Sequence, residues 1–195
     1  MGKTQFLPPS LQEPQQGWRR WWWASLRVMG IHTPIVKTLP LRLLWPDEAA
    51  TQAFANTLAQ APALSNAFIA LHGDLGAGKT TLVRHLLHAL GVTGRVKSPT
   101  YAVVEPYELP HMAIWHFDFY RFNDPREWED AGFRDIFSGP GLKLAEWPEK
   151  AASVLPVVDL DIFIVTAADT QRQVSLQAHT PTGAQLLDCL SGKTP

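Results

Sequence analysis

The chain contains the stretch Gly73-Asp74-Leu75-Gly76-Ala77-Gly78-Lys79-Thr80, which matches the phosphate-loop pattern G-x-x-x-x-G-K-[ST]. In such a loop the glycines let the backbone approach phosphate oxygens closely and adopt positive φ angles. Lys79 supplies an ammonium group for the outer phosphates, and Thr80 supplies a hydroxyl ligand for Mg²⁺. The stretch therefore predicts a nucleoside triphosphate site, rather than a glycine-rich turn that only caps a helix.

The residues on either side of the loop predict a strand and a helix. Residues 67–72 form a short, nearly continuous apolar run, as expected for a strand that is buried on both faces. Residues 81–90 carry apolar side chains on one helical face and polar side chains on the other. Gly91 follows at a position where helices commonly end in a left-handed residue. The motif thus stands between a strand and a helix, which is the context that a phosphate loop requires.

The composition is that of one globular domain with additional loops or a tail. The chain has 195 residues, of which 46% are hydrophobic and 18% are charged, so a sizeable core can form. The single cysteine, Cys189, cannot form an internal disulfide, and the sequence lacks a zinc-type cluster of cysteine and histidine, so we expect a reducing, cytoplasmic location. No apolar run of about 18 residues occurs, so a membrane span is not predicted.

Charge is distributed unevenly along the sequence. The first 45 residues contain six Lys or Arg and one acidic residue, whereas the remainder has more acidic than basic residues. Proteins that hold a nucleic acid backbone do so with clustered Lys and Arg. We therefore expect any contact with nucleic acid to be made mainly by another protein.

Residues 1–38 differ from the rest of the chain, since they combine several prolines and glutamines with the stretch Trp18-Arg19-Arg20-Trp21-Trp22-Trp23. Arg27 interrupts the apolar run, which argues against a secretory signal. We expect a dispensable, unstructured extension, and Met29 is an alternative start of the protein. The alternatives are a segment that contacts a partner or a membrane surface, and a packed element.

Further elements follow from the hydrophobic pattern and the turn residues. Strands are expected at residues 39–44, 101–108, 113–118, 142–146, 157–166 and 173–178, and helices at residues 46–61, from Asp124, and at residues 182–190. The second and third of these strands are expected to form a hairpin, and the last two an antiparallel pair. Together these elements predict one domain over residues 39–192. We expect a three-layer α/β sandwich of the P-loop NTPase type with a mixed, partly parallel sheet.

Two strand ends deliver carboxylates that could complete an NTPase site. Residues 113–118 form an apolar strand that ends in Asp118, as in a Walker B strand, and the strand at 142–146 ends in Glu146. Ser98-Pro99-Thr100 lies between the phosphate-loop helix and the next strand, where GTPases keep a switch that senses the γ-phosphate. Each of these signals is weak by itself, because acids after strands and Ser-Pro turns are common.

Together these motifs resemble the bacterial TsaE (YjeE) family of ATPases. The resemblance rests on the phosphate loop, Ser98–Tyr101, His116–Arg121 and Glu146–Glu149, and it covers about residues 39–161. It implies the ATPase component of tRNA threonylcarbamoyladenosine biosynthesis, with ATP or ADP and Mg²⁺ as cofactors and the proteins TsaB and TsaD as partners. In that family TsaD modifies adenosine 37 of tRNA, and ATP hydrolysis supports repeated cycles of the partner complex. Activity is then expected to be low without the partners, and tRNA is reached indirectly through them.

The resemblance also assigns roles to individual positions. The implied catalytic residues are Lys79, Thr100, Asp118 and Glu146, and the implied Mg²⁺ ligands are Thr80, Asp118 and Glu146. The implied nucleotide-binding residues are Gly73, Asp74, Leu75, Gly76, Ala77, Gly78, Lys79, Thr80, Thr81 and Trp147. The sequence leaves open which carboxylate touches the metal, and the resemblance favours Glu146 for the metal and Asp118 for the attacking water.

The remaining polar and aromatic residues of these motifs are interpreted as structural. His72 and His116 are taken as strand residues without a catalytic role, and Trp115 and Trp128 as core residues. Tyr120 and Arg121 are assigned to local packing, with a partner surface as the alternative.

Two other functions are compatible with a phosphate loop. A small-molecule kinase needs an acceptor pocket and usually a lid rich in arginine, and residues 124–130 offer only Arg126. A nucleotide-dependent scaffold with little turnover would use bound ATP only to organise a partner surface. Phosphoryl transfer to an acceptor would favour the kinase, and ATP-dependent association with slow turnover would favour the scaffold.

Overall fold

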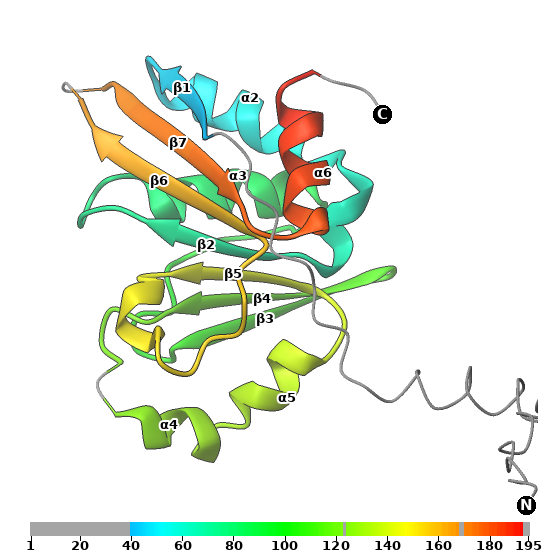
Figure 1. Cartoon of the computed structure of the whole chain (residues 1–195), viewed down its shortest axis with the longest axis vertical. Helices are drawn as coiled ribbons and strands as arrows, with labels where there is room; N and C mark the ends of the chain where they lie inside the picture. Colours follow the sequence, from blue (N-terminus) through cyan, green and yellow to red (C-terminus); the bar gives the residue numbers. More distant parts are fainter. Residues whose placement is uncertain (1–39, 123, 168–169, 193–195) are drawn as a thin grey trace, which may run out of the picture. The chain divides into compact units, whose positions relative to one another are not determined.

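The computed structural model describes residues 40–122, 124–167 and 170–192, so the predicted extension at residues 1–38 lies outside the described residues. The described part contains a seven-stranded sheet with the strand order β1-β7-β6-β2-β5-β4-β3 (Figure 1). The strands are β1 (Leu41–Trp45), β2 (Phe68–His72), β3 (Val104–Leu109), β4 (Met112–Asp118), β5 (Leu142–Glu146), β6 (Leu160–Thr166) and β7 (Arg172–Ala178). This α/β architecture confirms the predicted fold class.

The sheet is parallel at its centre and antiparallel at both edges. Strand β2 pairs in parallel with β5 and β6, and β4 pairs in parallel with β5. Strands β1, β7 and β6 are antiparallel to one another, as are β3 and β4. Glu146 at the end of β5 lies opposite Leu71 of β2 on one side and Asp118 of β4 on the other. The register thus brings the two carboxylates beside the start of the phosphate loop.

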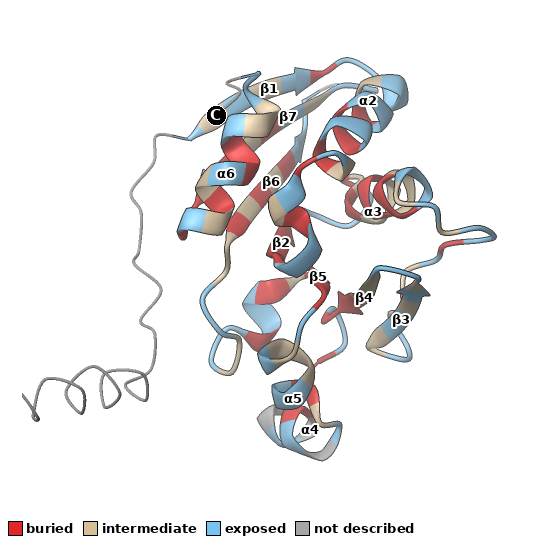
Figure 2. Ribbon diagram, turned by 90° about the vertical axis from the view of Figure 1, so that its right-hand side faces the viewer, coloured by how far each residue is buried: buried red, intermediate tan, exposed pale blue. Residues whose placement is uncertain are grey.

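Three helices cover one face of the sheet: α2 (Glu48–Ala59), α3 (Lys79–Ala89) and α6 (Pro181–Leu190). Their buried sides face the strands in Figure 2, and they pack on aliphatic side chains such as Ile69, Ile114 and Leu144. Asp47 caps α2 by accepting a hydrogen bond from the Ala50 amide at 2.9 Å, which fixes where that helix begins. A short 3₁₀ turn, η1 (Pro62–Asn66), connects α2 to β2.

The opposite face carries an aromatic cluster beneath α4 (Pro125–Asp130) and α5 (Phe133–Ser138), with the 3₁₀ turn η2 (Pro148–Ala151) beside it. Successive residues of a strand point to opposite faces, so Phe117 of β4 enters this cluster whereas Ile114 enters the aliphatic core. Trp128 is buried here, as expected from the sequence, whereas Trp115 packs against the cluster and is only partly buried. The helices on both faces make the three layers of the predicted sandwich.

Two local differences from the expected elements concern segments whose conformation depends on tertiary contacts. Helix α5 was not expected, because it has only six residues. Its apolar side chains pack against the aromatic cluster, and this contact cannot be read from the local sequence. Strand β3 begins at Val104 instead of residue 101, since Val103 has a φ of 66° and its amide donates to the Pro99 carbonyl at 2.7 Å. This turn closes the Ser98-Pro99-Thr100 segment into a loop. None of the helices in the described part is long and apolar enough to cross a lipid bilayer.

Candidate active site

The phosphate loop leaves β2 after His72 and enters α3 at Lys79. Gly73 has a φ of 140°, and a Cβ at this position would lie 2.3 Å from the Ile164 carbonyl oxygen, so only glycine fits. Gly78 has a φ of 110° and is the N-cap of α3, where no side chain caps the helix. The first N–H groups of α3 are therefore available to an anion, at the positive end of the helix dipole.

The Lys79 side chain is folded into the loop and is almost fully buried. Its ammonium donates hydrogen bonds to the carbonyl oxygens of Gly73 and Asp74, the latter at 2.9 Å, and lies 3.8 Å from the centroid of the Trp147 ring. Burial lowers the pKa of Lys79, and Glu146 is the carboxylate that opposes this most strongly. The loop thus holds a desolvated cation beside the pocket.

A carboxylate network forms where α3 meets β4 and β5. The Thr80 hydroxyl donates to the Glu146 carboxylate, at 2.9 Å from Oε1 and 3.0 Å from Oε2. His116 Nε2 lies 2.9 Å from the same Oε1, and both His116 and Glu146 are buried. The structure therefore brings Glu146 to Thr80, as the implied metal site requires, and adds His116, which the sequence analysis took as a strand residue only.

A second carboxylate network lies beside it. The Thr100 hydroxyl donates to Asp118 Oδ2 at 2.6 Å, and the Ser98 hydroxyl donates to the same oxygen. The other oxygen, Oδ1, accepts a hydrogen bond from the Tyr120 amide at 2.9 Å. The loop that contains Ser98 and Thr100 is thus tied to the end of β4 through the Asp118 carboxylate.

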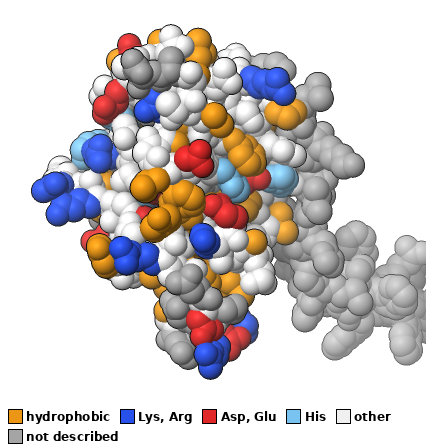
Figure 3. Space-filling view, turned by 90° about the vertical axis from the view of Figure 1, so that its left-hand side faces the viewer, with side chains coloured by type: hydrophobic (Ala, Val, Ile, Leu, Met, Phe, Trp, Pro, Cys, Tyr) orange, Lys and Arg blue, Asp and Glu red, His pale blue; other side chains and the backbone are white. Residues whose placement is uncertain are grey.

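These groups converge on one pocket of about 300 Å³. Its lining residues are Leu75, Gly76, Gly78, Lys79, Thr80, Thr81, Ser98, Thr100, Asp118, Tyr120, Glu146 and Trp147. Of the implied nucleotide-binding residues, Gly73, Asp74 and Ala77 belong to the loop but do not line the pocket. Figure 3 views the molecule from the side on which the central parallel strands end, and it shows apolar side chains beside acidic, basic and histidine side chains.

Trp147 closes one side of this pocket. Its backbone has a φ of 57°, which is rare for a residue other than glycine, and its ring contacts the Tyr120 ring with centroids 5.0 Å apart. The strained backbone directs the indole over the Lys79 ammonium. Tyr120 therefore has a packing role at the rim of the pocket, where its side chain is 42% exposed.

A second pocket of about 240 Å³ adjoins the first, since Gly78 and Thr81 line both. Its other lining residues are Trp45, Asp47, Glu48, Thr51, Ala77, Thr170 and Arg172. Arg172 Nε donates to the Ala77 carbonyl at 2.8 Å, so a residue of the terminal antiparallel strands braces the phosphate loop. Space for a ligand therefore extends past the first turn of α3.

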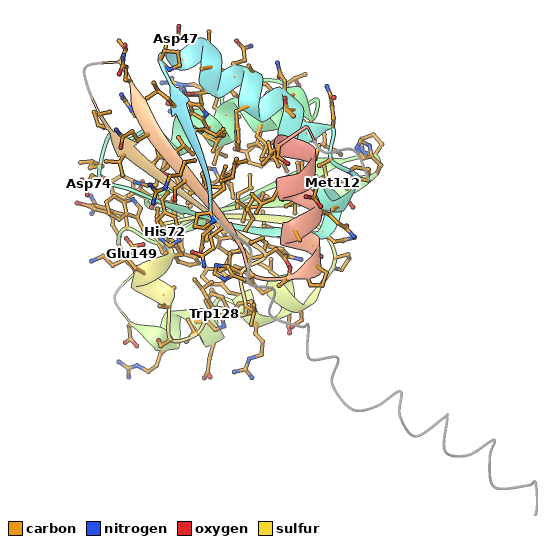
Figure 4. The ribbon with its side chains drawn as sticks, turned by 45° about the horizontal axis from the view of Figure 1, so that its top comes forward. Asp47, His72, Asp74, Met112, Trp128 and Glu149 are labelled. Carbon is orange, nitrogen blue, oxygen red and sulfur yellow. The ribbon has the colours of Figure 1, made fainter. Side chains whose placement is uncertain are left out.

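Another polar cluster lies on the opposite face of the sheet, and we call His72, Asp161 and His179 the Asp161 cluster. Asp161 Oδ1 lies 2.9 Å from His72 Nε2, and Oδ2 lies 2.7 Å from His179 Nε2. Burial raises the pKa of Asp161, but hydrogen bonds from the two histidines outweigh it, so the pKa is lowered. His72 Nδ1 also lies 3.7 Å from Glu149 Oε2. Figure 4 shows His72 and Glu149 near Asp74, on the other side of the molecule from Met112.

Comparison with known families shows which family of phosphate-loop proteins this chain belongs to. A family model described as "Threonylcarbamoyl adenosine biosynthesis protein TsaE" matches residues 45–174. The chain belongs to the TsaE family. The matched region includes the phosphate loop and the segments that carry Thr100, Asp118 and Glu146, so the resemblance expected from the sequence is confirmed.

Individual TsaE proteins match over most of the described residues. The tRNA threonylcarbamoyladenosine biosynthesis protein TsaE of Haemophilus influenzae is 44% identical over 121 residues, which cover 62% of this chain and 76% of that protein. The Bacillus subtilis protein of the same name is 37% identical over 143 residues, covering 73% of this chain and 87% of that protein. The crystal structure of Bacillus subtilis YdiB superposes with a TM-score of 0.65 at 29% identity, covering 79% of this chain and 95% of that one.

The donor atoms of this TsaE-family site fit Mg²⁺ better than a metal held by protein groups alone. No group of three or more His, Cys, Asp or Glu side chains among the described residues could hold a metal ion. Mg²⁺ usually keeps several waters and is bound through one or two carboxylates together with substrate phosphates. The Thr80 hydroxyl and the Glu146 carboxylate, in contact at the edge of the pocket, are a donor pair of this kind.

Two residues of the TsaE-family site, His116 and Ser98, were not among the predicted site residues. His116 precedes Asp118 by two positions on a strand, so the alternation of side chains places both on the face that carries α3. That spacing was the available signal for His116. Ser98 stands two positions before Thr100, and only the fold of the loop shows that both hydroxyls reach Asp118.

Proposed function

We propose that this protein is an ATPase that supports threonylcarbamoyl modification of adenosine 37 in tRNA by binding and cycling a partner complex of TsaB and TsaD proteins. One observation carries the proposal: the Thr80 hydroxyl lies 2.9 Å from Glu146 within a pocket that the phosphate loop also lines. This is the arrangement that a nucleoside triphosphate with Mg²⁺ requires. Family membership and the names of the relatives support the role in tRNA modification.

The phosphate loop and Lys79 would bind the triphosphate. Loop glycines and the uncapped start of α3 present N–H groups to phosphate oxygens. The Lys79 ammonium now bonds to loop carbonyls, and the same group can turn to the β and γ phosphates. Burial favours the exchange of carbonyl partners for phosphates, because the electrostatic attraction between a cation and an anion is stronger in a desolvated site than in water.

Glu146 and Thr80 are proposed as the residues that hold Mg²⁺. When bound, this ion would neutralise charge on the phosphate oxygens during phosphoryl transfer. Glu146 already accepts the Thr80 hydroxyl through both carboxylate oxygens, whereas Asp118 is engaged by Ser98 and Thr100. This division supports Glu146 as the direct metal ligand.

Asp118 is proposed to orient the attacking water together with Thr100. Water would add to the γ-phosphorus while the bond to the β-phosphate oxygen breaks, which yields ADP and phosphate. The Asp118 carboxylate is buried, is held by two hydroxyls and lines the pocket, so it is placed to accept a hydrogen bond from that water. Because Thr100 lies in a loop, a partner that moves the loop would change the rate.

Partners would carry the tRNA. Leu75 and Tyr101 are exposed apolar side chains next to the pocket or its loops, and Arg121 lies over the Tyr101 ring at 4.4 Å. Exposed aromatic and arginine side chains are enriched at protein interfaces. We therefore place the partner surface at the rim of the nucleotide pocket.

The test is phosphate release by the full chain, measured alone and with TsaB and TsaD proteins, together with a pull-down of the partners in ATP, in ADP and without nucleotide. We expect hydrolysis to be stimulated by the partners and association to depend on the nucleotide. Transfer of the phosphoryl group to a nucleoside or sugar, without release of phosphate, would favour a kinase instead. Association without any phosphate release would favour a scaffold.

A further inference from the structure

A fully buried histidine, His116, stands behind the carboxylate of Glu146. Strands β4 and β5 pair so that Asp118 lies opposite Glu146 and His116 opposite Leu144. His116 and Asp118 therefore share one face of the sheet, with His116 one step deeper and outside the residues that line the pocket. His116 thus belongs to the site through its contact with Glu146, although it is not part of the pocket wall.

The only hydrogen bond of the His116 ring among the described residues goes to Glu146. A carboxylate can only accept, so the 2.9 Å contact between Nε2 and Oε1 requires the proton on Nε2. The other ring nitrogen, Nδ1, is buried without a hydrogen-bond partner in the described part of the chain. An apolar side chain would avoid this cost, so packing alone does not explain a histidine here.

We propose that His116 is a positioning residue that fixes the Glu146 carboxylate for Mg²⁺. The proposal rests on the nucleotide and metal site proposed above. In the described part of the chain Glu146 has two side-chain partners: Thr80 contacts both oxygens from the pocket side, and His116 contacts only Oε1 from inside the sheet. The contact with Oε1 limits rotation of the carboxylate and directs Oε2 toward the pocket. Thr80 cannot do this alone, because the same hydroxyl is a proposed metal ligand.

Amide substitutions of His116 separate this role from packing. The side-chain nitrogen of glutamine reaches about as far as histidine Nε2, whereas that of asparagine reaches only as far as Nδ1. His116→Gln therefore keeps a donor for Glu146, and His116→Asn removes it while remaining polar. Loss of a group that orients a metal ligand typically reduces metal affinity by about 10–100-fold.

The experiment measures ADP binding by calorimetry on the full chain, with Mg²⁺ and with EDTA. The gain in affinity that Mg²⁺ provides is the readout, and binding in EDTA controls for an intact phosphate loop. We expect His116→Asn to reduce this gain about tenfold or more, and His116→Gln to remain within about threefold of the unsubstituted protein. In a protein that already carries Glu146→Ala, adding His116→Asn should not reduce the Mg²⁺-dependent gain in ADP affinity any further.

The inference is overturned if both amide variants keep the full Mg²⁺ effect, or if both lose it equally, since the second result would indicate packing. If His116→Asn does not fold, the glutamine variant decides alone, and a tenfold loss in it overturns the inference. A full chain that binds ADP no better with Mg²⁺ than with EDTA would overturn the proposed metal site, and with it the role of His116. A failure of the proposed function is therefore visible in the unsubstituted protein, and a failure of this inference only in the variants.

Discussion

Two polar networks lie on opposite faces of the same sheet and differ in where their oxygens point. We call the first the Glu146 network: Lys79, Thr80, His116 and Glu146 beside the phosphate loop. Its hydroxyl and carboxylate line a pocket of about 300 Å³. In the second, the Asp161 cluster, each carboxylate oxygen is bound by a histidine, and no member lines that pocket.

This difference shows that a largely buried carboxylate with a perturbed pKa is not by itself a sign of a functional site. Asp161 has a lowered pKa and two hydrogen bonds, yet its partners satisfy it within the fold. Glu146 is more deeply buried, with a side chain that is 3% exposed against 15% for Asp161, yet it shares its oxygens with groups that border open space. Perturbed groups accompany both structural ion pairs and active sites, and convergence on a pocket separates the two. The Glu146 network should therefore govern turnover, and the Asp161 cluster should govern stability.

The largest expected effect is on turnover in the Glu146 network. Lys79→Ala and Glu146→Ala should each lower ATP hydrolysis by about 100-fold or more, because each removes charge stabilisation at the transferred phosphate. The free energy of unfolding should fall by about 1–3 kcal/mol in Glu146→Ala, because this variant leaves the buried His116 ring without its hydrogen bond, and the protein should remain folded. Phosphate release and urea unfolding measure the two effects. Glu108→Ala, at an exposed position of β3, is the control and should retain activity. Hydrolysis at the normal rate in both site variants would refute the assignment.

Gly73 joins the two networks, since it follows His72 and its carbonyl accepts a hydrogen bond from Lys79. Gly73→Ala should cost about 2–4 kcal/mol and also weaken ADP binding, because its Cβ would meet the Ile164 carbonyl at a positive φ. Gly76→Ala is the matched control. Gly76 also has a positive φ but open space around it, so the cost should be about 1 kcal/mol. Equal costs in urea unfolding would show that backbone strain alone decides, without the contact to Ile164.

Within the Asp161 cluster the expected effect is on stability. Asp161→Asn should lower the free energy of unfolding by about 1–3 kcal/mol, since an amide cannot accept from both histidines. Hydrolysis should stay within about threefold of the unsubstituted protein. The reciprocal variant, Glu146→Gln, should lose activity and keep its stability. If the two variants changed the same property, the distinction between the networks would be wrong.

The smallest effect concerns pH. The pKa of Asp161 lies below the ordinary value of 3.8, so its ionised form stabilises the fold above that pH. This contribution is lost as pH falls through the lowered pKa of the folded state. Urea unfolding at about pH 6 and pH 3 should show a drop in stability of the unsubstituted protein that is smaller, by about 1 kcal/mol, in Asp161→Asn. A drop of the same size in both proteins would assign the acid sensitivity to other carboxylates.

Much of the fold could be predicted from the sequence, because its central elements are marked by local signals. Three signals are contiguous: the buried strand before the phosphate loop, the glycines of the loop and the amphipathic pattern of α3. Each of them indicates one kind of local structure. The strands that end in Asp118 and Glu146 were also predicted within a residue or two. Helix α5 could not be predicted in this way, since its six residues are stabilised by aromatic packing from distant segments.

The sequence predicted which residues form the candidate site better than it predicted the contacts between them. Lys79, Thr80, Thr100, Asp118 and Glu146 were each marked by a motif or a strand end, and all of them line one pocket. The position of Trp147 over Lys79 depends on a backbone φ of 57°, which no local pattern indicates.

By itself the sequence determined that this chain forms a phosphate loop between a strand and a helix, because glycine, lysine and threonine at fixed spacing act through neighbouring backbone atoms. The partners of Glu146 depend instead on the folded chain, since they lie 66 positions away at Thr80 and 30 positions away at His116. Those contacts follow from the register of β5 between β2 and β4. A register is set by the packing of whole strands, and a shift of one residue would turn Glu146 to the opposite face of the sheet.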